Sequence, residues 1–383
     1  MELLVKLMKP FFWEDLAVTI DGDTFEPYVI ETFFKASRGQ RLHVIISPSD
    51  PQLCALTKEQ EHERLMVIMK LLAPRFRRLH SLSVETVYRS TIVAISRFFD
   101  NVKMPQLTHL RLVPRIADDD SSLDISSLEC PHLYELHIDP ESFLNLAEDC
   151  DFIWPSGGDE FALHITSWKP TRPSNTVNSP RFIQALRDLG EARKESFAVE
   201  IQDVSFNHDD FYIRGAPIEY LYSLRLQGLT GFFLSILFEH IDFPGPNQIY
   251  ISHCDMEGDV NTDGQRRAVD GDELHLDNIR SSTSLLRMIQ DFRGFKVRIN
   301  DCPGFNDWVL GAMAFVCEKQ QRFACSSMTS LSIKGCTFSP DALKCMCEMR
   351  LGAGTIEDLD VSGAPPLDEH LRAWFVENVD EFS

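Results

Sequence analysis

Short stretches in which aliphatic and polar residues alternate recur along the whole chain, and each predicts a β-strand with one buried face. The inward aliphatic residue advances by 28, 26 and 27 positions from Leu82 through Leu110 and Leu136 to Leu163, and by 28 from Leu331 to Leu359. The chain is therefore a repeat with a period of about 27 residues. The predicted strands span 15–20, 41–46, 79–84, 107–112, 133–138, 161–165, 197–201, 221–226, 248–252, 273–276, 295–299, 328–333 and 356–361.

Segments with helical spacing of apolar residues separate these strands. Ser179-Pro180 and Ser339-Pro340 predict helix starts, with the serine as N-cap and the proline at the first helical position. Glycines that favour left-handed backbone follow several helical stretches, at Gly39, Gly245, Gly294 and Gly352. The predicted helices span 27–37, 58–72, 92–99, 182–189, 232–240, 285–292, 308–319 and 343–349.

One strand and one helix of this length cannot bury their apolar faces alone, so neighbouring units must stack. The sequence therefore predicts an α/β leucine-rich-repeat solenoid, a horseshoe with parallel strands on the concave face and helices on the convex face. We expect one solenoid over 1–383. Residues 1–14 would be an N-terminal cap or a linker from an upstream module, and 368–383 a C-terminal capping helix with an apolar stripe.

A cysteine follows the last inward aliphatic residue by three positions in three repeats, at Cys254, Cys302 and Cys336. Such a residue could be a metal ligand, half of a disulfide, a nucleophile or a small apolar plug. The three cysteines occupy equivalent positions of different repeats, in the slot that leucine-rich repeats fill with asparagine or cysteine. We interpret them as buried plugs in the turn that leaves the strand.

The chain is acidic, with 58 Asp and Glu against 37 Lys and Arg and a net charge of −21. This balance argues against nucleic acid and anionic membranes as partners and favours a protein partner. No apolar run is long enough to span a membrane, and the first residues lack the apolar core of a signal peptide. We expect a cytoplasmic or nuclear protein.

The repeats resemble the cysteine-type leucine-rich repeats of F-box/leucine-rich-repeat proteins, in particular those of mushroom-forming fungi. The stretches that carry this resemblance are LTHLRLV from Leu107, CPHLYELHI from Cys130, MTSLSIKGCTFSPDAL from Met328 and IEDLDVSGAPPLDEHLRAWFVENV from Ile356. The resemblance implies the substrate-recognition part of an F-box-type ubiquitin ligase receptor. No F-box precedes Asp15, so a ligase adaptor is expected as a partner only if an F-box lies upstream. The alternative is a stand-alone scaffold or inhibitor with no link to ubiquitin.

The residues between the inward aliphatics should line the concave face, where repeat proteins usually bind. We hypothesise that they bind an acidic or polar protein segment, because Arg and Tyr are favoured in binding hot spots. A solvated sheet face without a partner is the alternative. The predicted binding row is Arg111, His137, His164, Glu200, Arg225, Tyr250, His275 and Arg298, and it continues at its ends with Ser83, Ser332 and Asp360.

No other motif predicts chemistry. Asp259, Asn261, Asp263 and Asp270 resemble a calcium loop, but a strand precedes them and no helix, so we expect a flexible acidic insertion there and no metal site. No nucleophile and base are paired in a known motif, so we expect neither an enzyme nor a cofactor. Polar insertions at 115–127, 168–179 and 255–273 interrupt the period and are open to a binding role or to none.

Overall fold

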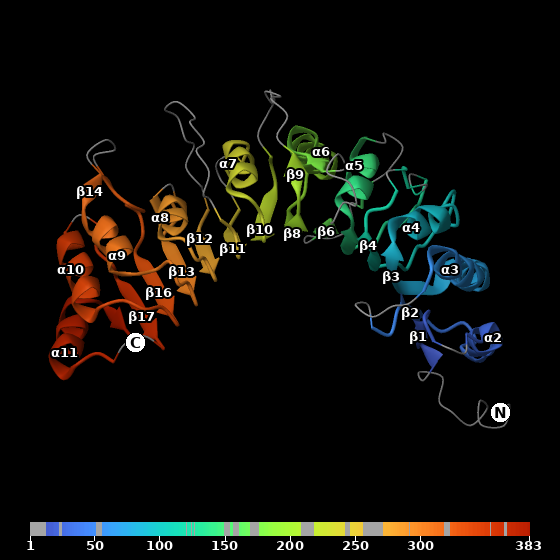
Figure 1. The fold of residues 1–383 in the computed structure, drawn as a ribbon, viewed down its shortest axis with the longest axis horizontal. Coiled ribbons are helices and arrows are strands. Elements are labelled where there is room, and N and C mark those ends of the chain that lie inside the picture. The colour runs from blue at the N-terminus through green and yellow to red at the C-terminus, as the bar shows by residue number, and fades with distance from the viewer. Residues whose placement is uncertain are drawn as a thin grey trace. The chain divides into compact units, whose positions relative to one another are not determined.

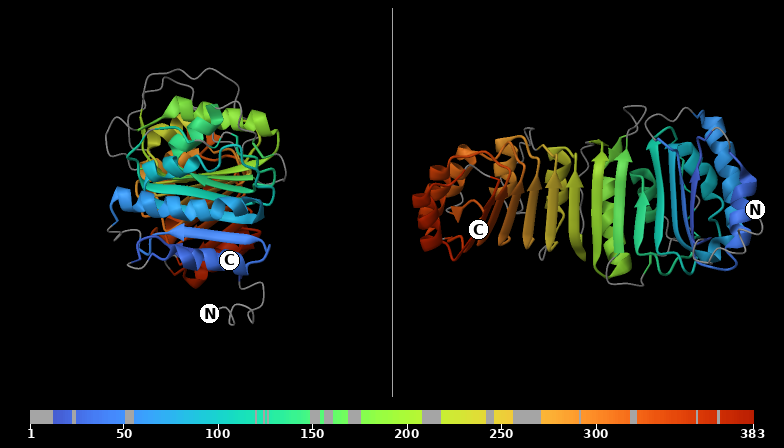
Figure 2. Two further views of the ribbon diagram at one scale, coloured as in Figure 1. Left: turned by 90° about the vertical axis from the view of Figure 1, so that its right-hand side faces the viewer. Right: turned by 90° about the horizontal axis from the view of Figure 1, so that it is seen from below.

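The computed structural model describes most of the chain and divides it into two compact units, Met1–Ile213 (unit 1) and Arg214–Ser383 (unit 2). The described residues are 13–22, 25–50, 56–119, 121–123, 125, 127–148, 154–155, 161–168, 176–207, 218–241, 246–255, 271–290, 292–317, 322–352, 354–363 and 366–383. In each unit, strands lie side by side in one sheet and the helices cover one face of that sheet (Figures 1 and 2). The predicted leucine-rich-repeat fold is therefore confirmed.

Every strand predicted from the alternating pattern is present. Unit 1 contains β1 (Asp15–Thr19), α2 (Pro27–Ala36), β2 (Leu42–Ser47), α3 (Lys58–Leu72), η2 (Ala73–Arg78), β3 (Leu79–Tyr88), α4 (Arg89–Ser96), β4 (His109–Ile116), β5 (Glu135–Ile138), α5 (Pro140–Glu148), β6 (Phe161–Trp168), β7 (Val177–Asn178), α6 (Ser179–Arg193), β8 (Phe197–Val204) and β9 (Phe206–Asn207). Unit 2 contains β10 (Leu221–Gln227), α7 (Gly231–Glu239), β11 (Gln248–Ser252), β12 (Glu273–Asp277), α8 (Ser282–Gln290), β13 (Lys296–Asn300), α9 (Asp307–Ala314), β14 (Val316–Cys317), β15 (Arg322–Phe323), β16 (Ser330–Lys334), α10 (Pro340–Arg350), β17 (Asp358–Ser362), α11 (Glu369–Asn378) and β18 (Glu381–Phe382).

Parallel pairing in chain order places equivalent residues of successive repeats in rows. Leu82, Leu110, Leu136 and Leu163 face one another across β3, β4, β5 and β6, and none is more than 1% exposed. A second inward row in unit 2 runs from Leu224 on β10 to Leu359 on β17. Burial of each such side chain stabilises the fold by about 1.5–3 kcal/mol, so the aliphatic repeat fixes both the pairing and its register.

The three cysteines in the predicted slot are buried plugs, as predicted, and each is hydrogen-bonded to backbone of another repeat. Cys302 is fully buried. Its Sγ accepts from the Ile279 N–H at 3.3 Å and donates to the Leu276 carbonyl at 3.5 Å, and Cys254 bonds Leu229 and Leu226 in the same way. Cys336 donates to the Ile299 carbonyl. The small sulfur therefore joins neighbouring turns without opening the core.

Helix ends follow the predicted chemistry, with two local corrections. Ser339 caps α10, where its hydroxyl accepts from the Ala342 N–H at 3.1 Å. At α6 the cap is Asn178 rather than Ser179, whose hydroxyl instead donates to the Asn207 carbonyl. Gly39 and Gly352 have positive φ, as expected, whereas Gly294 is required for close packing, because an added Cβ would lie 2.1 Å from the Gly271 carbonyl oxygen. Gly245 lies outside the described residues.

Other elements also differ from the predictions. Helix α9 ends at Ala314, since residues 316–317 pair antiparallel with 322–323, so the predicted helix over 308–319 is too long. Helix α5 was missed because Pro140, at its start, follows directly on the strand pattern. The C-terminal capping element is not one helix, because α11 ends at Asn378 and residues 381–382 add a last strand beside β17.

Candidate functional site

The candidate site is the open face, the face of each unit's sheet that the helices leave uncovered (Figure 1). In unit 1, strand register aligns Ser83, Arg111, His137, His164 and Glu200 across β3, β4, β5, β6 and β8. In unit 2, it aligns Arg225, Tyr250, His275, Arg298, Ser332 and Asp360 across β10, β11, β12, β13, β16 and β17. The predicted row therefore exists within each unit, and its role in binding stays a prediction.

In unit 1 the row meets a carboxylate that the sequence analysis did not single out. Glu135, two residues before His137 on β5, has one carboxylate oxygen 2.5 Å from His137 Nε2 and 3.5 Å from His164 Nε2. Its other oxygen lies 3.3 Å from His109 Nε2. The rings of His137 and His164 stack in parallel with centroids 4.0 Å apart. We call Glu135, His137 and His164 the Glu135 cluster.

The neighbours of this cluster define where its protons lie. Arg111 donates from Nη1 to His137 Nδ1 at 3.1 Å and from Nε to Glu85 at 3.0 Å. Because a guanidinium only donates, His137 must carry its proton on Nε2, from which it donates to Glu135. Burial lowers the pKa of His137, and the nearby Arg111 and His164 lower it further, against the effect of Glu135. His137 is therefore neutral at physiological pH.

In unit 2 the row is a stack of aromatic and cationic groups. The Arg225 guanidinium lies 4.4 Å from the centroid of the Tyr250 ring, which stacks on the His275 ring at 4.1 Å. Arg225 is exposed, and no ion pair joins it to a carboxylate within the part of the chain that the structure describes. We call Arg225, Tyr250 and His275 the Tyr250 ladder.

The next strand carries cations that a carboxylate already neutralises. Glu273 accepts from His275 Nε2 at 3.1 Å and pairs with Lys296 at 3.3 Å and Arg298 at 3.8 Å. Burial works to raise the pKa of Glu273, but these donors and charges outweigh it and hold that pKa below its ordinary value. Among the described residues, Arg298 and Arg111 of the predicted binding row therefore both have acidic partners, whereas Arg225 has none.

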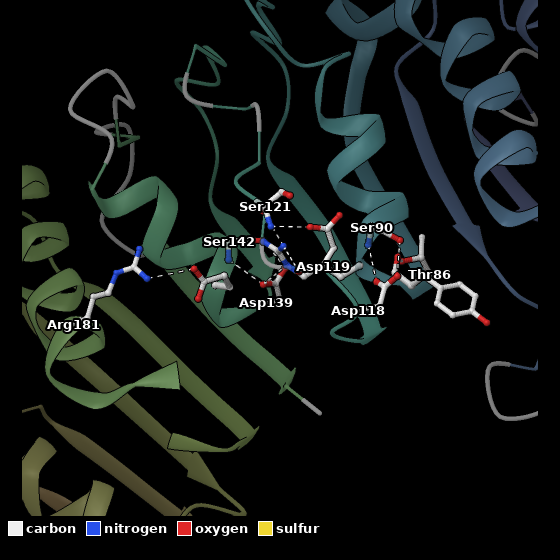
Figure 3. Close-up of polar contacts among 11 residues, drawn as sticks. Thr86, Ser90, Asp118, Asp119, Ser121, Asp139, Ser142 and Arg181 are labelled. Carbon is white, nitrogen blue, oxygen red and sulfur yellow. Dashed lines mark hydrogen bonds and ion pairs between the residues drawn. The ribbon is translucent and has the colours of Figure 1, made fainter. Parts of the chain in front are cut away.

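The insertion predicted at 115–127 is anchored to the core of unit 1. The fully buried Arg89 pairs with Asp139 at 3.1 Å and donates to the backbone carbonyls of Asp119 and Ser121. Asp118 accepts from the Ser90 N–H and hydroxyl (Figure 3). This part of the insertion is therefore built into the fold, which disfavours a flexible linker.

The other candidate segments add no described site. Trp168 is the last residue of β6 and is buried, 5.8 Å from the Arg89 guanidinium. The calcium-loop residues Asp259, Asn261, Asp263 and Asp270 lie outside the described residues, as does most of the insertions at 168–179 and 255–273. Among the described residues, no helix is both long enough and apolar enough to cross a membrane.

Sequence reasoning missed Glu135 and Glu273 because it considered only the residue between the two inward aliphatics. The signal was present: both strands read Glu-Leu-His, at 135–137 and 273–275. Residues two apart on a strand point to the same face, so this tripeptide places a carboxylate beside an imidazole.

No family model matches the chain, and no curated protein matches it. Fourteen solved chains match. One belongs to the crystal structure of the Rad7 and Elc1 complex in yeast, with 14% sequence identity and a TM-score of 0.36 over 87% of this chain and 81% of that chain.

Proposed function

We propose that this chain is a protein-binding leucine-rich-repeat domain that holds an acidic protein segment on its open face. The observation that carries the proposal is the Tyr250 ladder, in which an exposed arginine is held on a stacked pair of rings. Tyrosine and arginine give much binding energy per residue, since their contact area is large and their planar groups lose little conformational freedom.

The ladder supports an acidic ligand in particular. Arg225 can present its forked N–H groups to a carboxylate of the partner, because its face is held against Tyr250 and no described carboxylate pairs with it. Tyr250 is itself held by the hydrogen bond from its hydroxyl to Gln248 at 3.1 Å. A site that is rigid before binding loses less entropy when the partner arrives.

The charge pairs elsewhere in the row limit which residues can supply binding energy. Binding at Arg111 or Arg298 would require a partner to compete with Glu85 or Glu273, and such exchange gains little free energy on a solvated face. We therefore place the binding energy on Arg225 and Tyr250 and assign Arg111, His137, His164, Glu200, His275 and Arg298 to the surrounding contact surface.

The finer proposal is that the bound segment belongs to a substrate of an F-box-type ubiquitin ligase. Its support is the resemblance of the repeat motifs, and fold alone does not define such a role. Binding of the cullin-RING adaptor by the gene product that includes any upstream sequence tests it. An adaptor complex supports the receptor role, whereas its absence leaves a protein-binding repeat domain without a link to ubiquitin.

The binding proposal is tested with peptides selected from a random library on the whole chain. We expect acidic peptides whose affinity falls about tenfold or more with Arg225→Glu and also with Tyr250→Ala. Arg372→Glu is the matched control, since Arg372 is exposed on α11 and makes the same change in net charge. Peptides that bind the Arg225→Glu variant as tightly as the original chain would contradict the proposal.

A further inference from the structure

From the geometry of the Glu135 cluster we infer that the open face of unit 1 binds one divalent transition-metal ion, of the zinc class, through Glu135, His137 and His164. This inference goes beyond the proposed function and does not rest on it. Two imidazoles and a carboxylate are an established zinc donor set that leaves the fourth position open to water or to a ligand. The potential donor atoms of the three side chains lie within 4.8 Å of one another.

The strongest observation is the contact between His164 and Glu135. Glu200 accepts a hydrogen bond from His164 Nδ1 at 3.0 Å, and a carboxylate only accepts, so the proton of the neutral ring lies on Nδ1. The lone pair of His164 Nε2 then faces a Glu135 oxygen 3.5 Å away. Two acceptors this close repel each other unless a proton or a metal ion lies between them.

The distance between His164 and Glu135 suits an ion of this class, whereas the 2.5 Å contact between His137 Nε2 and Glu135 must lengthen when the ion binds. Donors bound to one tetrahedral zinc ion at about 2.1 Å lie about 3.4 Å apart, close to the 3.5 Å between His164 Nε2 and Glu135. Glu200 also supplies the outer hydrogen bond that commonly orients a metal-binding histidine. The three side chains are between 17% and 26% exposed, so an ion can reach them from solvent.

Two local movements would accompany binding. The stacked rings of His137 and His164 are parallel, with an interplanar angle of 4°, and must tilt toward each other, because a metal lies close to the plane of each imidazole that binds it. His137 must also change tautomer, so that its proton moves from Nε2 to Nδ1, and the Arg111 N–H must therefore leave Nδ1. Arg111 is partly exposed and keeps Glu85 as a partner, so it can move aside.

The surrounding charges favour a cation. Among the described residues, Glu85, Glu135 and Glu200 face the site together with the cation Arg111 and the histidines His109, His137 and His164. No cysteine takes part in this cluster. The donor set therefore consists of nitrogen and oxygen, which separates it in spectroscopy from any ion held by thiolates.

The test is calorimetric titration of the tag-free whole chain with Zn²⁺, in excess Ca²⁺ and Mg²⁺ so that sites for hard cations are occupied. We expect one zinc ion per chain. Affinity should fall about 100-fold with His137→Ala or His164→Ala, and about tenfold with Glu200→Gln through loss of the outer hydrogen bond. His275→Ala is the control, because His275 also bonds a glutamate two residues before it but has no second imidazole beside it.

Binding of Co²⁺ identifies the donor atoms. We expect visible absorption bands of a nitrogen and oxygen site, absent from His137→Ala and His164→Ala. Circular dichroism verifies that each variant is folded, and His164→Gln, which keeps polarity at the position, serves where alanine does not fold. Absence of binding by the original chain, affinity unchanged in the histidine variants, or charge-transfer bands of bound thiolate would each overturn the inference.

Discussion

Strands β5 and β12 carry the same tripeptide, Glu-Leu-His, in different surroundings. In both, the carboxylate accepts a hydrogen bond from the imidazole two residues later, at 2.5 Å in β5 and 3.1 Å in β12. The neighbouring strands decide the rest. Beside Glu135 they supply His109 and His164, and beside Glu273 they supply Lys296 and Arg298.

The difference teaches that one repeated motif takes its chemistry from the adjacent repeats. Imidazoles can lose their protons and bind a metal, whereas the ammonium and guanidinium groups around Glu273 keep their charge and repel one. The carboxylate of Glu135 on β5 can therefore bind an ion, whereas that of Glu273 on β12 is paired with permanent cations. The solenoid allows this variation because the open face needs no apolar residues to hold the fold together.

Removal of each glutamate in turn should give the largest difference in Zn²⁺ affinity between β5 and β12. Glu135→Ala is expected to weaken Zn²⁺ binding about 100-fold, because it deletes the one negative ligand, while Glu273→Ala should leave the affinity unchanged. Calorimetric titration of both variants checks this. An equal loss of Zn²⁺ affinity in both variants would contradict the proposed difference between β5 and β12.

Arg111 gives the second test, in the opposite direction. Arg111→Met should tighten Zn²⁺ binding about tenfold, since it removes a positive charge and the donor that occupies His137 Nδ1. Arg298→Met, the matched change beside β12, should create no comparable affinity, because His275 still has no second imidazole beside it. An affinity that falls with Arg111→Met would show that Arg111 supports the site instead of competing with the ion.

The sequence predicted the repeat and its open face well, and the reason is physical. An inward leucine such as Leu136 is stable only in the core. The spacing of these leucines along the chain therefore defines the strands, their register and the row of residues beside them. The cysteine slot at Cys302 followed from the same periodicity. Element boundaries were predicted less well where a strand pattern and a helix start lie close together, as at Pro140, which lies two residues after the end of β5.

The site itself was predicted only in part. The residues of the row were predicted correctly. Whether a cation in the row is free to bind a ligand depends on a carboxylate from another strand, such as Glu85 for Arg111 or Glu273 for Arg298. Such diagonal contacts require both the register and the side-chain rotamers. For the same reason the Glu135 cluster was overlooked, since its ligands come from β5 and β6 and only their pairing brings them together.

The smallest expected effect concerns stability. Glu273→Gln should destabilise unit 2 by about 1 kcal/mol near neutral pH, because Lys296 and Arg298 lose the charge that offsets their repulsion on a partly exposed face. Glu135→Gln should cost less, because the partners of Glu135 are imidazoles and not permanent cations. Urea unfolding of the two variants beside Glu377→Gln, an exposed change on α11, measures the difference.

The pH dependence of the Glu273 effect has a defined sign. The folded-state pKa of Glu273 is lowered, since the donors and charges around it outweigh the raising effect of burial. Its carboxylate therefore stabilises the fold fully above the unfolded pKa of about 4.3, and this contribution disappears as pH falls through the lower folded pKa. The gap between the original chain and Glu273→Gln should accordingly be constant from about pH 8 to 6 and shrink below about pH 4. A gap that widens toward acid would mean that Lys296 and Arg298 are not its partners in solution.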